Sequence, residues 1–160
     1  MEVPDQDVDT GSEALTPTTI RAIAIVVVWR EDQLLVSEGF DRMKRTPYYR
    51  PLGGGIEPGE RSHEAAAREM REEVGFDVVD LTLLGVLENL FVVDVKPGHE
   101  IIFVYQGRFS DARAYEAAEL RGIEADGEPI RAVWRPLSSF NAYERLVPEG
   151  LMALLAPDAA

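Results

Sequence analysis

The stretch that decides the fold runs from Gly54 to Phe76 and reads GGIEPGERSHEAAAREMREEVGF. It predicts a glycine-rich turn followed by one short helix. Pro58 and Gly59 mark the turn. A helix N-cap is expected at Ser62, and Gly75 stands where a left-handed C-terminal cap is expected. Between these signals the sequence predicts a helix of about a dozen residues.

The predicted helix has an acidic side beside its apolar side. At about 100° per residue, Glu69, Glu72 and Glu73 fall close together. Like charges three or four residues apart disfavour a helix by roughly 0.2 to 0.5 kcal/mol per pair. Arg68 is spaced to pair with Glu72, whereas Glu69 and Glu73 are left without a partner inside the helix. Two interpretations remain open, a solvated helix crossed by ion pairs and a divalent cation held by carboxylate oxygens. The apolar side, which is expected to pack inward, consists of Ala66, Ala67, Met70 and Val74.

The spacing of the whole stretch favours the second interpretation. Gly54, then Glu60 after five residues, then the run Arg68 to Phe76 after seven more, match every fixed position of the Nudix box. The chain therefore resembles the Nudix hydrolases. The box covers about a seventh of the chain, and the predicted order of strands extends the resemblance to most of it.

The resemblance implies a role for each matching residue. Glu69, Glu72 and Glu73 would be ligands of Mg²⁺ or Mn²⁺, and the main-chain carbonyl of Gly54 would complete the site. Glu60 would lie near the metal ions or pair with Arg68, which would then hold the carboxylates in orientation.

The resemblance also implies the reaction, which is hydrolysis of a pyrophosphate bond in a nucleoside diphosphate linked to a group X. Water is the expected nucleophile, because the chain has no cysteine and neither His63 nor His99 has an obvious Ser or Asp partner. The alternative is a Nudix-fold sensor that binds a nucleotide or sugar nucleotide without cleaving it. A sensor could dispense with a box carboxylate, and this box has lost none.

The sequence offers several candidates for the general base. Inside the box, Glu72 is a candidate. Many relatives use an acidic residue on a loop outside the box, and Glu128, six residues before Trp134, has the position of that residue in MutT-like members. Glu124 and Glu100 are alternatives.

The substrate is expected to be a small nucleotide. The markers of the ADP-ribose and diadenosine polyphosphate branches, a proline or a tyrosine shortly after the box, are missing, since residues 89–95 read NLFVVDV. This favours a MutT-like nucleoside triphosphate or a generic nucleoside diphosphate derivative over an ADP-ribose or nucleotide-sugar pyrophosphatase. The residues expected to contact substrate are Arg50, Tyr48, Tyr49, Phe91 and Glu100, with the aromatic rings as candidates to stack on a base.

Composition limits the class of protein. A chain of 160 residues, 46% hydrophobic, suits one domain. The net charge of −13 argues against nucleic acid as the main partner. There is no apolar run of membrane-spanning length and no signal-peptide pattern, so a cytoplasmic protein without a membrane partner is expected. The sequence carries no signal for an oligomeric state, and an isologous homodimer is expected only because dimers are the commonest oligomers of soluble proteins.

The remaining sequence predicts a mixed α/β (α+β) fold, with a mixed central sheet between helices. Residues 1–17 are expected to be an acidic flexible tail, and residues 18–160 a single domain. Residues 38–47 are expected to be a loop whose basic cluster either meets phosphates or is simply solvated, residues 96–98 a turn, and residues 110–127 a helical turn or loop. The expected strands are 21–29, 33–37, 78–95, 100–109 and 130–136, and a C-terminal helix is expected over 148–155.

Overall fold

The centre of the fold is β1 (Arg21–Arg30), whose apolar residues Ile23 to Val28 are fully buried. The computed structural model describes residues 16–156, so residues 1–15 of the expected tail lie outside the described part of the chain. Along one edge β1 pairs in parallel with β6 (Lys96–Phe109), and along the other it pairs antiparallel with β4 (Leu52–Gly55). The strand is apolar on both faces because alternate residues pack into two separate apolar clusters, Ala24, Val26 and Val28 on one face and Ile23, Ile25 and Val27 on the other.

Nine strands make up the sheet within residues 16–156. The order is β5, β6, β1, β2, β3 and β9, with β4 attached to β1, β8 to β2, and β7 to β8. Most neighbours are antiparallel, while β1 with β6 and β3 with β9 are parallel. The sheet is therefore mixed, as expected. The strands not yet given bounds are β2 (Gln33–Asp41), β3 (Thr46–Arg50), β5 (Val78–Val93), β7 (Glu119–Ile123), β8 (Pro129–Pro136) and β9 (Arg145–Leu146).

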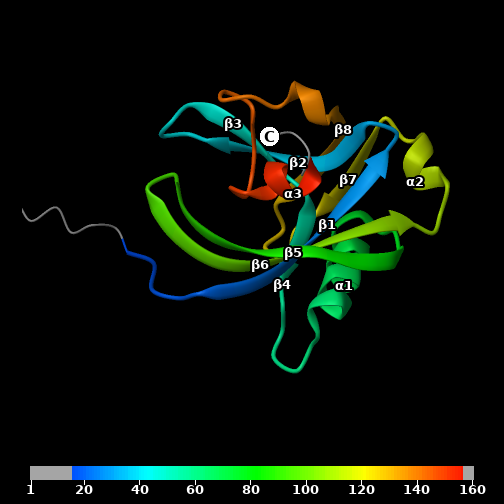
Figure 1. Cartoon of the computed structure of the whole chain (residues 1–160), viewed down its shortest axis with the longest axis horizontal. Coiled ribbons are helices and arrows are strands. Elements are labelled where there is room, and N and C mark those ends of the chain that lie inside the picture. The colour runs from blue at the N-terminus through cyan, green and yellow to red at the C-terminus, as the bar shows by residue number, and fades with distance from the viewer. Residues whose placement is uncertain (1–15, 157–160) are drawn as a thin grey trace, which may run out of the picture.

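Helices cover both faces of this sheet. Figure 1 shows α1 (Ser62–Val74) and α3 (Leu151–Leu155) on opposite sides of the β5–β6 strands. Each helix closes its own apolar cluster, α1 through Met70 and α3 through Leu151. The expected sandwich of helices around a mixed sheet is thus confirmed. The remaining short elements are α2 (Arg113–Glu116) and a 3₁₀ turn, η1 (Leu137–Ser139), and no helix within residues 16–156 is long and apolar enough to cross a membrane.

The helix of the box ends where the sequence predicts and begins one residue differently. Gly75 is left-handed, with φ of 75°. At the other end Arg61, not Ser62, is the N-cap, and its main-chain N–H donates to the Glu64 carboxylate at 2.8 Å. Ser62 is the first residue of the helix, and its hydroxyl pairs with that of Tyr105 on β6 instead of capping the helix.

Several other boundaries differ from the expected ones. The β5–β6 turn is at Asp94 and Val95, which both have positive φ, so residues 96–98 belong to β6. This two-residue turn matches the twist of the hairpin strands better than the expected turn. β2 and β3 pair as far as Asp41 and Thr46, which reduces the expected basic loop to residues 42–45.

The region expected to be a helical turn or loop contains both a helix and a strand. After the one turn of α2, β7 pairs with β8 over five residue pairs, from Glu119 with Val133 to Ile123 with Pro129. The helical pattern of this segment was overridden by these cross-strand hydrogen bonds. The C-terminal helix starts at Leu151, three residues later than expected.

Candidate active site

Glu73 is the buried carboxylate of the box. It lies on the side of α1 that faces β4, and only 9% of the residue is exposed. Its Oε2 accepts a hydrogen bond from the Gly53 N–H at 3.2 Å. Burial, together with the negative charges of Glu69 and Glu124, raises the pKa of Glu73 to about 8. A buried carboxylate of this kind favours a positive partner.

Glu69 lies one turn earlier on α1, against the next glycine of β4. A Cβ added to Gly54 would come within 2.5 to 2.7 Å of the Glu69 carboxyl atoms. Only glycine therefore allows the β4 backbone to approach this carboxylate so closely. The pKa of Glu69 is raised by burial, and the neighbouring Arg68 opposes the shift.

Arg68 organises the exposed edge of the same cluster. Its Nε and Nη2 donate to the two carboxylate oxygens of Glu60, at 2.7 and 3.0 Å. Its Nη1 donates to Glu69 at 2.9 Å and to Glu72 at 3.2 Å, and Nη2 also donates to the Gly55 carbonyl at 2.9 Å. The Arg68 guanidinium holds the pKa of Glu60 down at about 2. Glu69 therefore does have a partner inside the helix, contrary to the expectation from spacing, because a long arginine side chain can bend back onto its next neighbour.

The residues of the cluster fit a hard divalent cation in chemical type. Carboxylate and carbonyl oxygens are the ligands that Mg²⁺ and Mn²⁺ prefer. Glu69 and Glu73 are adjacent along α1, and the missing Cβ of Gly54 leaves its backbone open toward Glu69. In the described residues no three acidic, His or Cys side chains are already gathered as a complete ligand set. Glu72 is more than half exposed and turned to Arg68.

A cavity of about 860 Å³ lies between the β5–β6 hairpin, β3 and the segments 17–21 and 145–149. Arg50 links it to the carboxylates, because its side chain lines the cavity and its positive charge also acts on Glu73. Phe91 and Glu100 line the cavity as well. The Phe91 ring rests on Gly98, where an added Cβ would meet it at 2.1 Å, and the buried Glu100 lies 3.8 Å from Arg21.

Of the two tyrosines, the structure places Tyr48 in the cavity wall and Tyr49 in the core. Tyr49 is 4% exposed, its ring lies 4.4 Å from the Arg135 guanidinium and packs against Phe140, and its hydroxyl donates to Glu38 at 3.3 Å. The Tyr49 ring is therefore not available to stack on a base. Successive residues of a strand point to opposite faces, and the sequence alone did not show which face β3 turns to the cavity.

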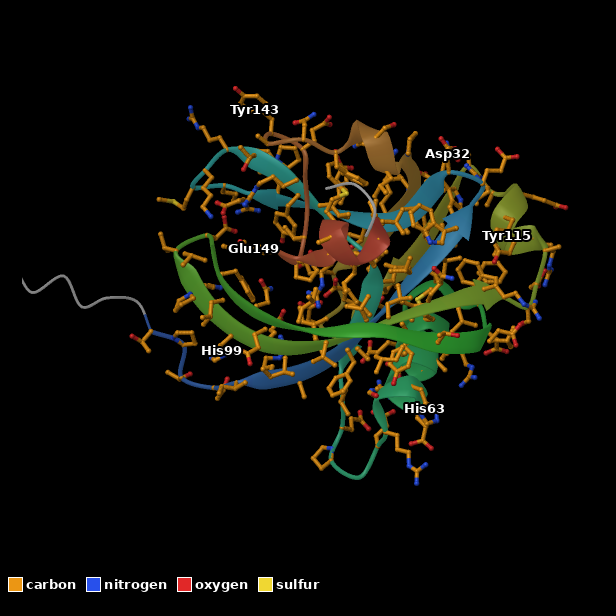
Figure 2. The ribbon with its side chains drawn as sticks, viewed as in Figure 1. Asp32, His63, His99, Tyr115, Tyr143 and Glu149 are labelled. Atoms are coloured by element: carbon orange, nitrogen blue, oxygen red, sulfur yellow. The ribbon has the colours of Figure 1, made fainter. Side chains whose placement is uncertain are left out.

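The candidates for general base also differ in position. Glu124 and Glu128 flank a tight turn between β7 and β8, in which the Glu124 N–H donates to the Glu128 carbonyl at 2.8 Å. Both side chains are exposed. The charge of Glu124 contributes to the raised pKa of Glu73. The two histidines lie apart, His63 on α1 and His99 on the β5–β6 hairpin (Figure 2), so they form no pair.

Some cavity residues were not singled out from the sequence. Lys44 was part of the basic cluster that was noticed, but Arg145 reaches the site only because β9 pairs with β3, at Tyr48. No local signal marks a two-residue strand of this kind. The cavity residues without an expected role include Asn89, Lys96 and Arg145.

Comparison with known proteins places the chain in a family. The NUDIX domain family matches residues 18–153, which is most of the chain. The chain belongs to the NUDIX family. A solved structure of a MutT NUDIX hydrolase from Burkholderia pseudomallei has a TM-score of 0.60 at 21% identity and covers 86% of this chain and 97% of that one. At this identity the likeness shows that the fold is shared.

Two curated proteins with NUDIX-type activities are similar in sequence. The ADP compounds hydrolase NudE of Escherichia coli (strain K12) is 41% identical over 75 residues, which is 45% of this chain and 38% of that protein. The RNA pyrophosphohydrolase of Dinoroseobacter shibae is 27% identical over 147 residues, covering 84% of this chain and 89% of that one. The match to NudE thus spans well under half of that relative's length.

Proposed function

We propose that this NUDIX domain hydrolyses the pyrophosphate bond of a nucleoside diphosphate linked to a group X. The observation that carries the proposal is the position of Glu73. This carboxylate is buried, accepts a hydrogen bond from the β4 backbone, lies one helical turn from Glu69, and is near enough for the charge of Arg50 to act on it, while Arg50 lines a cavity large enough for a nucleotide.

In this proposal Glu69, Glu72 and Glu73, with the Gly54 carbonyl, hold Mg²⁺ or Mn²⁺. When bound, the ion supplies charge neutralisation at the phosphates and activation of water. Arg68 fixes the orientation of Glu69 and Glu72 and is itself fixed by its two hydrogen bonds to Glu60. Arg50 binds phosphate oxygens from the cavity side.

For the base we propose an acidic residue that reaches the water from outside the metal cluster. Glu124 is favoured because its negative charge raises the pKa of Glu73, which indicates that the two carboxylates are near each other. Glu128, at the other end of the same turn, and Glu72 remain candidates. Replacing each by glutamine and comparing the pH–rate profiles separates them, since loss of the base removes the acidic limb of the profile.

The substrate we propose is an NDP–X compound rather than a nucleoside triphosphate. The cavity continues along the β5–β6 hairpin well beyond Arg50, which leaves room for a group on the far side of the pyrophosphate. The similarity to an ADP compounds hydrolase supports the same choice over the MutT-like branch. We propose that the partner is a small molecule and not a nucleic acid, in keeping with the net charge of −13.

The test is turnover by the purified protein and by Glu73→Gln. With Mg²⁺ or Mn²⁺, a panel of dNTPs (oxidised ones included), ADP-ribose, nucleotide sugars and dinucleoside polyphosphates should give a nucleoside monophosphate from at least one NDP–X compound. Glu73→Gln should reduce kcat by about 100-fold or more, because a ligand and its charge are lost, while circular dichroism shows the same fold. If wild type binds a nucleotide but releases no product from any compound, the protein is a sensor and the proposal fails.

A further inference from the structure

The cavity has a second end, far from the box carboxylates, where two hairpin tips meet. One tip is the β2–β3 turn, residues 42–45, and the other is the β5–β6 turn at Asp94 and Val95. The Arg42 N–H donates to Asp94 Oδ1 at 2.6 Å, and Lys44 Nζ donates to the Val92 carbonyl at 3.0 Å. Figure 1 shows both hairpins extending to the same side of the molecule. These contacts close the cavity at this end.

The closed end is basic in an otherwise acidic protein. Five cationic and three anionic side chains line the cavity, although the whole chain carries a net charge of −13. Both Lys44 and Lys96 line the cavity here, and the Lys44 ammonium reaches the backbone of Val92, the residue next to the Val93 that pairs across the hairpin with Lys96. Within residues 16–156 no carboxylate lies within 4 Å of the Lys96 ammonium, whereas Lys44 has Asp41 at 3.7 Å. Lys96 is therefore a cation without a protein partner in the described part of the chain.

Nearby acidic groups offset only part of this charge. Asp94 accepts a hydrogen bond from the neutral Arg42 N–H, and Asp41 lies 3.7 Å from Lys44. Two carboxylates therefore stand against the four cations of the two hairpin tips, which are Arg42, Lys44, Arg45 and Lys96. Glu100 is at the other end of the cavity and pairs with Arg21. Glu149 reaches the cavity from the segment before α3 (Figure 2). Arg145, which enters beside Tyr48, adds a second cation that has no carboxylate within 4 Å in the described residues.

Strand register gives the distance between the two ends. Arg50 lies four residues along β3 from Thr46, which begins the strand two residues after Lys44, and this is a span of about 13 Å. The opposite wall gives the same length, because Asn89 is level with Glu100 and Val93 is level with Lys96. A pyrophosphate held at Arg50 therefore leaves X extending toward Lys44 and Lys96, whose flexible four-carbon stems can reach back to meet it.

From this geometry, and resting on the proposed function, we infer that X is itself anionic and that Lys96, with Lys44, binds its carboxylate or phosphate group. The closed end favours a small molecule, since a nucleic acid strand would have to continue past the joined hairpin tips. Lys96 on β6 is then a specificity determinant that takes no part in the chemistry at the box.

The experiment uses fragments of X, so that it does not depend on the nucleobase. Two matched pairs are tested as inhibitors of the best substrate from the panel: glucose 1-phosphate against glucuronic acid 1-phosphate, and ribose 5-phosphate against ribose 1,5-bisphosphate. In wild type the more highly charged member should inhibit about tenfold more strongly, as expected for a charge-assisted hydrogen bond. The first pair reports a carboxylate site and the second a phosphate site.

Lys96→Gln should remove most of this difference and leave kcat for a substrate with uncharged X within about twofold. Lys96→Arg should retain the difference. Arg45→Gln is the matched control, because it makes the same change of charge in the β2–β3 turn without lining the cavity, and it should behave like wild type. Equal inhibition by both members of each pair in wild type, or equal weakening of both by Lys96→Gln, would overturn the inference while leaving hydrolysis intact. Absence of turnover on the whole panel would instead defeat the proposed function, and calorimetric titration of the same pairs would then still report on Lys96.

Discussion

At the scale of single residues, the site depends on glycines that let β4 approach α1. Gly54 and Gly55 are neighbours in the sequence and differ in what a side chain would meet. An added Cβ at Gly54 would overlap the Glu69 carboxyl group, whereas at Gly55 it would meet only Arg21 Nη2, at 3.8 Å. Alanine at each of these two positions therefore tests whether catalysis requires the close Gly54–Glu69 contact or simply a glycine in β4.

We expect Gly54→Ala to reduce turnover by about 100-fold, because a displacement of Glu69 by about 1 Å is enough for such a loss. Its free energy of unfolding should change little, since the atoms in conflict are the flexible end of a side chain that can move aside. Gly55→Ala should retain turnover within about twofold. Steady-state kinetics and urea unfolding of both variants test this. Equal activity of the two alanine variants would show that the Gly54–Glu69 contact has no role in catalysis.

At the scale of secondary structure elements, α1 is positioned by β7 as well as by β4. The backbone of β7 passes so close to the C-terminal turn of α1 that a Cβ on Gly122 would lie 1.3 Å from the Glu73 carbonyl oxygen. The added Cβ would meet backbone atoms of α1, at Glu73 and Val74, so the conflict can be relieved only by moving the helix or the strand. The strand that the sequence did not predict is therefore part of the support of the site.

Gly122→Ala is expected to lower the free energy of unfolding by about 3 kcal/mol or more, at the upper end of the range for overpacking. The adjacent Arg121→Ala, whose side chain is exposed and pairs only with Glu119 at the surface, should change it by about 0.5 kcal/mol or less. Chemical denaturation of the two variants gives the comparison. A Gly122→Ala protein as stable as wild type would mean that α1 and β7 are less tightly packed than the structure shows.

At the scale of the whole molecule, the buried charge of Glu73 makes stability depend on pH. The pKa of Glu73 is about 8 in the folded protein, above the value of 4.5 expected for an exposed glutamate. The folded state therefore binds a proton that the unfolded state releases, and this stabilising term is complete below pH 4.5. It is lost as the pH rises from about 4.5 through 8, by about 5 kcal/mol at most for a shift of this size.

In EDTA, wild type should therefore become less stable between pH 5 and pH 8.5 relative to Glu73→Gln, which lacks the titrating group. Excess Mg²⁺ should restore stability at pH 8.5 in wild type, by about 2.7 kcal/mol at 100 times its Kd, and much less in Glu73→Gln. Urea midpoints at several pH values, with and without Mg²⁺, measure both effects. Parallel pH profiles for the two proteins would contradict the burial of Glu73.

The sequence by itself determined the elements whose signals are local. Three features depend on residues close together in the sequence: the continuous apolar run of β1, the left-handed Gly75 and the acidic side of α1. The structure has all three where they were predicted. The family also follows from one continuous stretch, because the box residues lie within 23 positions. Such elements can be predicted from sequence because the interactions that stabilise them involve residues close together in the chain.

Only the tertiary structure decided which residues share the site. Glu73 is buried because Gly53 and the β7 backbone close around it, and Tyr48 rather than Tyr49 faces the cavity. Lys44 and Lys96 line the same cavity because two hairpins distant in sequence meet at Val92. The turn at Asp94 and Val95 and the strand β7 likewise depend on cross-strand hydrogen bonds that outweigh local preference. Each of these features is set by contacts between segments far apart in the chain, and burial, pKa and the cavity exist only once those contacts have formed.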